Sequence, residues 1–373
     1  MAIVNYNQSR VKQFRRCQKQ YSFRYDYAEL YGGPRIAGQE MIPVQKKLPL
    51  YRGSWMHALQ EALHYQWAGV PKFKIKFGEG RHSLVIKAKT WKDVHAALKE
   101  QFDGMFEEEQ DLLGDLPTEC ERLFKAYLRY WNEDQEKYSV ATIDGKPAIE
   151  YIMDLPLPGV KRAHFKGKLD LLVEDLEYGG LWIWDAKWVK NIPAPDERMM
   201  SPQATQYVWA LRELGFDIRG FVYNYGRTKP PTEPRVLVRG TLSVAKRMDT
   251  DFATYAAAIK RTHGKDWKKF LPYYRPKLDE LRGRDSTWFR RERIPVEPER
   301  VERGLMEYEA TVRDIQRREE GDVPRSYFYN CKFGCDYHEL CVAEFQGLDI
   351  SPLVKSNYMF SEERYGEEDL LKD

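Results

Sequence analysis

The chain has 373 residues, of which 42% are hydrophobic and 31% are charged, and its formal net charge is +3 at pH 7. A chain of this length can bury one large core or two ordinary ones, whereas a mean hydropathy of −0.68 excludes a membrane-spanning protein. The opening residues MAIVNYNQSRVKQF lack an apolar stretch after a basic one, so we expect no secretory signal and a cytoplasmic location without membrane contact.

The first predicted element is a helix with Ser9 as its N-cap. Phe14, Cys17, Tyr21 and Tyr25 recur at spacings of three and four, so Cys17 is expected to face inward with the aromatic side chains. Basic residues occupy much of the remaining surface of this helix. Those that we regard as candidate nucleic-acid contacts are Arg15, Arg16 and Lys19.

A second helix is predicted by the apolar spacing from Trp55 to Trp67, and His57 lies near its start. We expect residues 1–85 to contribute the N-terminal helices of the fold. The next segment, residues 86–146, has helical periodicity that an Asp-Leu-Pro sequence interrupts. This segment is therefore predicted to be a helical insertion of at least two helices.

The central prediction is a β-hairpin over KGKLDLLVEDLEYGGLWIWDAK, residues 166–187. An antiparallel register centred on residues 177–178 places Asp170 opposite Asp185, and Lys187 falls on the same face as Asp185. Carboxylates that face each other across two strands repel one another. They suit a hard divalent cation bound through oxygen atoms, with the lysine ammonium aimed at a phosphate.

A strand precedes this hairpin, and a helix and further strands follow it. Glu150 lies on the preceding strand, and the helix QATQYVWALRELGF places Gln203 and Tyr207 on one face. The segments IRGFVYNYGR and VLVRGTLSV are both strand-like. The order strand, strand, strand, helix, strand over residues 147–245 predicts an α/β sandwich rather than a doubly wound sheet.

Residues 246–345 are predicted to be mainly helical, basic and rich in aromatic residues. Either this surface is simply solvated, or it forms a single-strand channel in which the aromatic rings stack on bases; the rings could equally form a core. The candidate nucleic-acid contacts here are Lys268, Lys269, Arg290 and Arg291. Residues 346–373 form an acidic tail that we expect to be frayed.

Three cysteines, Cys331, Cys335 and Cys341, lie within eleven positions. Because a cytoplasmic protein has little use for disulfides, this density favours a metal site over scattered thiols. A closed site needs a fourth ligand, for which Cys17 and Cys120 are available. We choose Cys17, which lies beside a basic helix face, whereas Cys120 has acidic neighbours; a histidine between the last two cysteines is the alternative ligand. Spacing does not distinguish zinc from iron and sulfur.

Together these residues resemble the PD-(D/E)XK nuclease superfamily, and within it the RecB-like exonucleases with an iron–sulfur cluster, including the AddB nuclease domain and CRISPR-associated nucleases. The matching pieces run in order across almost the whole chain. They are residues 53–57, Glu150, the GKLD sequence ending at Asp170, the Asp185-Ala186-Lys187 triplet, Gln203 with Tyr207, and one early and three late cysteines. One departure is the three-residue spacing between Cys331 and Cys335, where two residues are more usual.

The resemblance implies an α/β, restriction-endonuclease-like fold with a mixed central sheet flanked by helices, and a Mg²⁺ or Mn²⁺ site. The implied metal ligands are His57, Asp170, Asp185 and the Ala186 carbonyl. The implied catalytic residues are Asp170, Asp185, Lys187, Glu150, Gln203 and Tyr207. The implied ligands of a 4Fe–4S cluster, with Zn²⁺ as the alternative, are Cys17, Cys331, Cys335 and Cys341.

The function that we expect is metal-dependent hydrolysis of DNA by an exonuclease that acts on single strands or duplex ends. A helicase or a recombination or CRISPR-adaptation partner would supply unwinding. Two alternatives stay open: a DNA-end-binding scaffold with little cleavage, and a nuclease of the same fold that acts on RNA.

Overall fold

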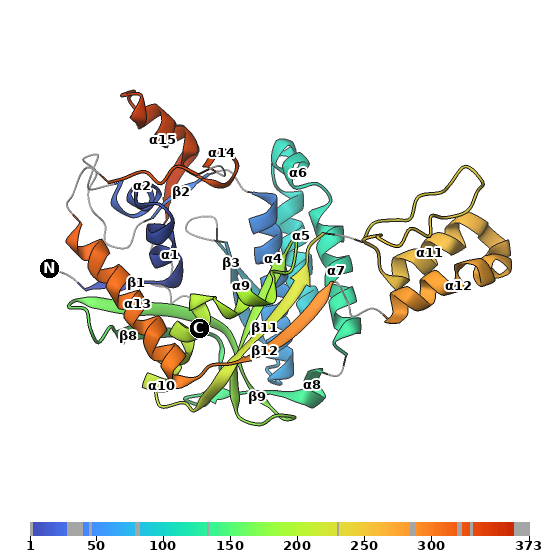
Figure 1. The fold of residues 1–373 in the computed structure, drawn as a ribbon, viewed down its shortest axis with the longest axis horizontal. Helices are drawn as coiled ribbons and strands as arrows, with labels where there is room; N and C mark the ends of the chain where they lie inside the picture. Colours follow the sequence, from blue (N-terminus) through green and yellow to red (C-terminus); the bar gives the residue numbers. More distant parts are fainter. Residues whose placement is uncertain are drawn as a thin grey trace.

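The computed structural model describes residues 3–27, 40–44, 47–78, 83–132, 134–229, 231–283, 288–318, 323–328 and 331–361. The described residues form a mixed seven-stranded sheet through the centre of the molecule (Figure 1), with the order β1-β9-β10-β11-β12 and with β5 and β8 also paired to β9. The strands are β1 Val4–Tyr6, β5 Tyr138–Val140, β8 Ile149–Pro156, β9 Ala163–Asp175, β10 Leu181–Val189, β11 Ile218–Arg227 and β12 Phe289–Pro295.

The turn between β9 and β10 sets the register of the central hairpin. The Asp175 carboxylate accepts hydrogen bonds from the backbone N–H groups of Glu177 and Tyr178, both at 3.0 Å, as in an Asx turn. Gly179 and Gly180 follow with positive φ angles of 73° and 79°, a conformation that favours glycine. This local geometry therefore fixes which residues of the two strands face each other.

The register of the hairpin agrees with the prediction. Trp184 pairs with Leu171 across the antiparallel strands, so the next position in the same register places Asp185 opposite Asp170. The helix α10, Pro202–Glu213, separates β10 from the parallel strand β11. The predicted order of three strands, a helix and a strand is confirmed.

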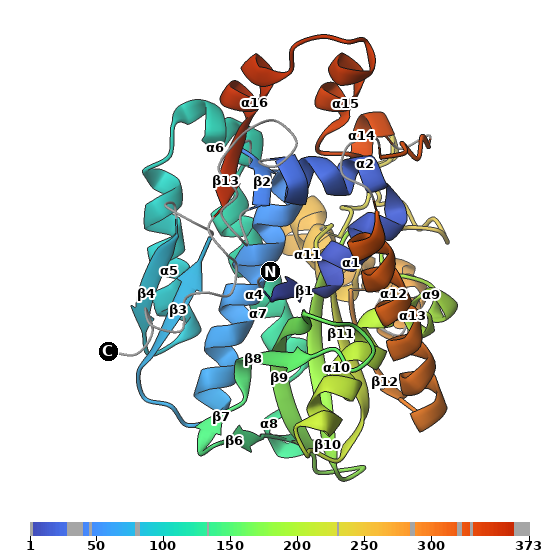
Figure 2. The same cartoon turned by 90° about the vertical axis from the view of Figure 1, so that its left-hand side faces the viewer.

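Helices cover both faces of the sheet (Figures 1 and 2), which explains why β10 is buried along almost its whole length. One face packs against α10, α1 (Gln8–Arg16) and α13 (Pro298–Arg317). The other face packs against α4 (Leu48–Trp67) and, near its edge, α7 (Leu116–Tyr130).

The segment after α4 contains a small hairpin that the sequence analysis missed. Strand β4, Leu84–Ala88, pairs with β3, Phe73–Phe77, so the predicted helical insertion begins with a strand. The helices of this region are α5 Trp91–Asp103, α6 Glu107–Leu113, α7 and α8 Asp134–Lys137, and a short hairpin follows with β6 Thr142–Ile143 and β7 Lys146–Pro147.

The N-terminal helix differs from its prediction at both ends. Its N-cap is Asn7, whose side chain accepts from Arg10 N–H at 2.7 Å, and not Ser9. The helix stops at Cys17, which is extended with φ −161°. A new start gives α2 Gln18–Tyr21 and a π-helical turn at Ser22–Asp26.

The predicted strand VLVRGTLSV is wrong. Within it the structure has one isolated bridge, between Val236 and Leu242. The neighbour of β11 is instead β12, which lies in the segment that was predicted to be helical. The sequence of this strand does not alternate between polar and apolar residues, because Arg291 and Arg293 occupy inward positions. Their charges are paired there with Asp134 and Asp175.

Residues 231–283, the projecting module, are inserted between β11 and β12 and extend away from the body of the molecule (Figure 1). The module contains α11 Phe252–His263, a short 3₁₀ turn at Gly264–Asp266, and α12 Trp267–Gly283. It has its own core, to which Trp267, Phe270 and Tyr274 belong. These aromatic residues therefore pack inward. Of the two roles considered for them, stacking on bases or forming a core, the structure shows the core.

The C-terminal segment of the described chain lies beside the N-terminal segment. Its elements are α14 Cys331–Gly334, α15 His338–Phe345, α16 Ser351–Asn357 and β13 Tyr358–Ser361. Strand β13 pairs with β2, Glu40–Pro43, so the predicted frayed tail is ordered up to residue 361, and residues 362–373 lie outside the described part. Among the described helices, we find none with the length and apolar character to cross a membrane.

Arg291 lies on β12, and its side chain is buried against one face of the sheet. Its guanidinium makes two bonds to the Asp134 carboxylate, at 2.6 and 2.8 Å, and lies 3.9 Å from the ring of Trp131 and 4.1 Å from the ring of Trp184. The side chains of the ion pair are only 6% and 3% exposed. A paired charge in such a place is tolerated, whereas an unpaired one is not.

We predict that Asp134→Ala lowers the free energy of unfolding by about 3–5 kcal/mol, because it leaves the buried Arg291 charge without a partner. Urea unfolding measures this loss. Asp103→Ala, which removes half of the exposed Lys99–Asp103 pair, should cost less than about 1 kcal/mol. The double variant Asp134→Ala/Arg291→Met should recover most of the loss; equal stability of the parent and Asp134→Ala would contradict the prediction.

Candidate active site

Three charged side chains meet where β9 and β10 run side by side. The Asp185 carboxylate is 3% exposed and accepts hydrogen bonds from Lys187 Nζ and Gln203 Nε2, both at 2.9 Å. Lys187 Nζ also lies 2.7 Å from the second Asp185 oxygen. The sequence alternation therefore placed Asp185 and Lys187 on one face, as predicted.

Asp170, on β9, is the third charged side chain of the site. Its Oδ2 accepts a hydrogen bond from the Ala186 backbone N–H at 2.8 Å, so a side chain takes the place of a ladder bond there. The N–H and C=O of one strand residue face the same neighbour. The Ala186 carbonyl is therefore directed to the side of β10 on which Asp170 lies, as a metal ligand would require.

His57 reaches this site from α4. Its Nδ1 lies 3.7 Å from Asp170 Oδ2, and its side chain is 38% exposed. Burial, and next the Lys187 ammonium, lower the pKa of His57. The imidazole is thus kept neutral, which is the form that binds a metal.

Glu150 occupies the third strand of the site, β8, with a positive φ of 52°. A non-glycine residue in this conformation is strained, and such strain clusters at functional sites. The Glu150 carboxylate forms an ion pair with Lys168 of β9. Glu150 is therefore held by a cation beside the site and is not a solvent-facing strand residue.

Glu61 is an acidic residue of the site that the sequence analysis missed. It lies four positions after His57, one turn further along α4. Burial, and next the Glu150 charge, raise the pKa of Glu61 well above its usual value, and Asp170 acts in the same direction. The spacing of His57 and Glu61 on one helix face was the signal that could have revealed it.

Gln203 and Tyr207 both lie on α10 and face the hairpin. Gln203 binds Asp185, and the Tyr207 hydroxyl donates to the Lys168 backbone carbonyl at 3.0 Å. The two residues thus hold β10 and β9 from one helix. Their predicted spacing is observed, and these contacts position the acidic residues.

The electrostatics of the site favour a bound cation. Burial raises the pKa of Asp185 to about 6, with Lys187 opposing and Asp170 adding to the effect. Burial and Glu150 raise the pKa of Asp170 as well. The anionic carboxylates are thus costly when alone, and oxygen donors of this kind suit Mg²⁺ or Mn²⁺. Within the described residues, no three Cys, His, Asp or Glu side chains are already arranged to hold a metal.

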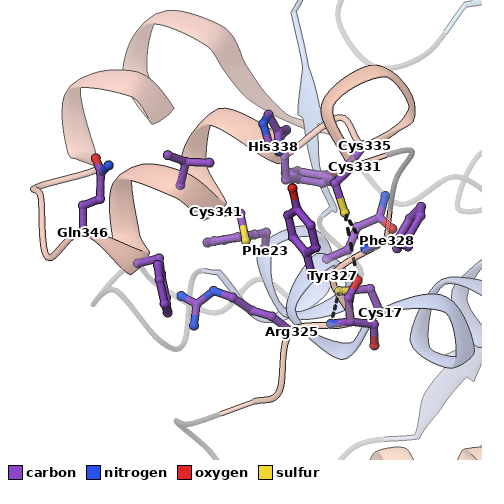
Figure 3. Close-up of a pocket in the computed structure, with 15 residues that line it drawn as sticks. Cys17, Phe23, Arg325, Tyr327, Phe328, Cys331, Cys335, His338, Cys341 and Gln346 are labelled. Carbon is purple, nitrogen blue, oxygen red and sulfur yellow. Dashed lines mark hydrogen bonds between the residues drawn. The ribbon is translucent and has the colours of Figure 1, made fainter.

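The four predicted cluster cysteines lie around one cavity at a second place (Figure 3), and these described side chains are not already arranged to hold a metal. Cys17, Cys331, Cys335 and Cys341 line one cavity of about 430 Å³. Cys17 comes from the break between α1 and α2, and the others come from α14, the turn after it, and α15. The remaining cysteine, Cys120, is buried in the separate core between α4, α5 and α7.

Two of these thiols have backbone N–H groups beside them, which a metal–thiolate group would use. The backbone N–H groups of Ser326 and Phe328 point at the sulfur atoms of Cys17 and Cys331, each at 3.5 Å, as hydrogen bonds to cluster sulfurs do. Burial raises the pKa of Cys335 to about 11. The thiol is therefore protonated when free, and binding of a metal would release its proton.

The candidate nucleic-acid contacts divide into two groups. Two of them have buried side chains that are paired inside the protein: Lys19 pairs with Glu344 at 2.6 Å, and Arg291 pairs with Asp134. The others lie at the surface. They are Arg15, which donates to Thr311 and the Glu307 carbonyl, Arg16, which donates to the Gly334 carbonyl, and Lys268, Lys269 and Arg290.

The fold and the site define a mixed α/β domain in which two opposed carboxylates and a lysine occupy the central hairpin. The family model of the PD-(D/E)XK nuclease superfamily matches residues 5–342. The chain belongs to this superfamily, and its central mixed sheet with flanking helices is the restriction-endonuclease-like fold. Nucleases of this superfamily typically use Mg²⁺ or Mn²⁺. No curated protein matches the chain.

The raised pKa of Asp185 predicts a pH-dependent stability of the metal-free protein. An unfolded aspartate titrates near pH 3.9, and the folded one titrates near 6, so this stabilising contribution is full below about pH 4 and is lost as the pH rises to about 6. Asp185→Asn should therefore raise the free energy of unfolding at pH 7 in EDTA by about 2–3 kcal/mol.

Urea unfolding at pH 4 and pH 7 provides the measurement. At pH 4 the parent and Asp185→Asn should be nearly equal in stability, and Asp103→Asn, at an exposed position, should change neither value. A loss of stability in Asp185→Asn at pH 7 would show that the fold favours the anionic carboxylate.

Proposed function

We propose that this chain is a Mg²⁺- or Mn²⁺-dependent DNA exonuclease of the RecB-like group, acting on single strands or duplex ends. The observation that carries the proposal is the set of two opposed carboxylates beside Lys187, the buried Asp185 and the partly buried Asp170. An ordinary structural ion pair would not need two acids whose charges repel in a buried place. In a nuclease, repulsion between two carboxylates is expected where they bind a cation, because the cation offsets their charges.

Each residue has a role in this proposal. Asp170, Asp185, His57 and the Ala186 carbonyl would hold the ion, which would activate water and polarise the scissile phosphate. Lys187, fixed by Asp185, places its positive charge where a phosphate gains negative charge. Gln203 keeps Asp185 in position through its hydrogen bond.

Glu150, Glu61 and Lys168 form a connected acidic and basic group next to the ion-binding residues. The Lys168 ammonium pairs with Glu150, and Coulomb attraction to Glu150 raises the pKa of Lys168. This group would hold water or a second ion beside the first.

We predict that Lys187→Ala and Asp170→Ala each lower DNA cleavage by at least about 100-fold, since the first removes positive charge beside the reacting phosphate and the second removes a ligand of the ion. Labelled single-stranded and duplex DNA with Mg²⁺ or Mn²⁺ provide the assay. Lys161→Ala removes an exposed lysine in the turn between β8 and β9 and should cleave normally.

The same assay tests the alternatives. Retention of DNA without cleavage by the parent protein would favour a DNA-end-binding scaffold, and preferential cleavage of a matched RNA would favour the RNA-directed nuclease. Unchanged cleavage by both Lys187→Ala and Asp170→Ala would overturn the assignment of the site.

We also propose that Cys17, Cys331, Cys335 and Cys341 bind a structural 4Fe–4S cluster. Support comes from the shared cavity and from the N–H groups aimed at two of the sulfurs. Four thiolates accept either a cluster or Zn²⁺, and the wide separation of Cys17 from the others is unlike both a zinc finger and a ferredoxin sequence.

Anaerobically purified protein should be brown, with about four iron atoms per chain, and Cys335→Ala should remove the colour and most of the iron. Absorbance and iron analysis measure both. Cys120→Ala, outside the cavity, should keep the full iron content. A colourless parent protein with stoichiometric zinc would contradict the iron–sulfur assignment and favour zinc.

A further inference from the structure

The projecting module has an exposed apolar tip. Val236 and Leu242 form an isolated bridge, and a turn joins them. Val236 is 60% exposed, and Val238 in the turn is fully exposed. Leu237, between them, is also exposed. Solvent contact of adjacent large apolar side chains is costly and commonly marks a binding surface. Arg235 and Arg239 flank these residues in the sequence.

Hydrogen bonds hold this tip in a defined shape. Leu237 N–H donates to the Thr241 carbonyl at 2.7 Å, and Ser243 N–H donates to the Arg235 carbonyl at 2.8 Å. Arg239 donates to the hydroxyl of Tyr273 on α12 at 2.7 Å. The apolar side chains are therefore presented on a supported turn that the helices of the module brace.

The module behind the tip is strongly basic. Residues 231–283 contain twelve lysines and arginines against six acids, a net charge of +6. Because the whole chain carries +3, the other residues together carry −3. Positive charge concentrated on one projecting part is the electrostatic pattern of a nucleic-acid-binding surface, and it disfavours a basic protein as the occupant.

The base of the module lies next to the candidate active site. Lys187 of β10 pairs with Tyr225 of β11, and two residues later Val189 pairs with Arg227, where β11 ends. Arg227 holds Asp249 of the module through two bonds of 2.9 Å. The module thus departs from the sheet about 7 Å along the strand from the lysine of the site.

We propose that the tip, residues 235–239, is a wedge that opens the end of duplex DNA, so that one strand can enter the active site. The apolar side chains would insert beside the terminal base pair. Proteins that bend DNA insert apolar side chains between base pairs in a similar way. The basic surface of the module would hold the phosphates without regard to sequence. This inference rests on the proposed nuclease function and assigns a duplex end as the substrate of the same site.

The test compares three DNA substrates of equal length: a blunt duplex, a duplex with a splayed end, and a single strand. Val236→Ser/Val238→Ser should lower cleavage of the blunt duplex by about 10-fold or more, whereas the splayed duplex and the single strand should be cleaved within about 2-fold of the parent rate. Val238→Leu keeps an apolar tip and should retain blunt-end cleavage. Phe106→Ser, which removes an exposed apolar side chain on another part of the surface, is the matched control.

A second readout does not depend on cleavage. In the Lys187→Ala background, 2-aminopurine at the terminal base pair of a blunt duplex should brighten on binding, and the added serine substitutions should abolish this rise. Unchanged blunt-end cleavage and fluorescence in the serine variant, with single strands still cleaved by the parent, would overturn the wedge alone. An equal loss of cleavage on all three substrates would also overturn it. A parent that cleaves no DNA but whose tip binds a protein would overturn both the wedge and the proposed nuclease function.

Discussion

The placement of two opposed carboxylates in one hairpin is the constraint on which the rest of the site depends. Asp185 is buried and Asp170 is 18% exposed, on strands whose two sides are covered by helices, so water screens their repulsion only weakly. Lys187 compensates for one charge only. With no cation present this arrangement costs stability, and His57 of α4 and Gln203 of α10 contact the two acids.

The two ends of the described chain are joined by more than the cysteine cavity. Strand β2 pairs with β13, Lys19 pairs with Glu344, and Asp26 pairs with Arg318, the residue that follows α13. The cysteine cavity lies inside this set of contacts. A bound cluster would thus reinforce an existing closure between the N-terminal and C-terminal segments, and would lie apart from the acidic site in the central hairpin.

Charge is distributed unevenly over the molecule, and this separates structural roles from binding roles. Several arginines of the body, such as Arg291 and Arg198, are buried in ion pairs. The excess of positive over negative charge lies in the projecting module, and most of its aromatic residues belong to its core, whereas Tyr273 is exposed. A count of basic and aromatic residues along the sequence cannot distinguish these two situations, because both have the same composition.

The sequence by itself determined the central hairpin, its register and the helix that carries Gln203 and Tyr207, because alternation, turn residues and helical spacing are local properties. It also indicated Cys17 as the partner of the late cysteines. Only the tertiary structure decided that Lys19 and Arg291 are buried, that Glu61 joins the site, and that β12 completes the sheet in place of residues 236–244. These outcomes depend on contacts between residues far apart in the chain, where packing and ion pairing override local patterns.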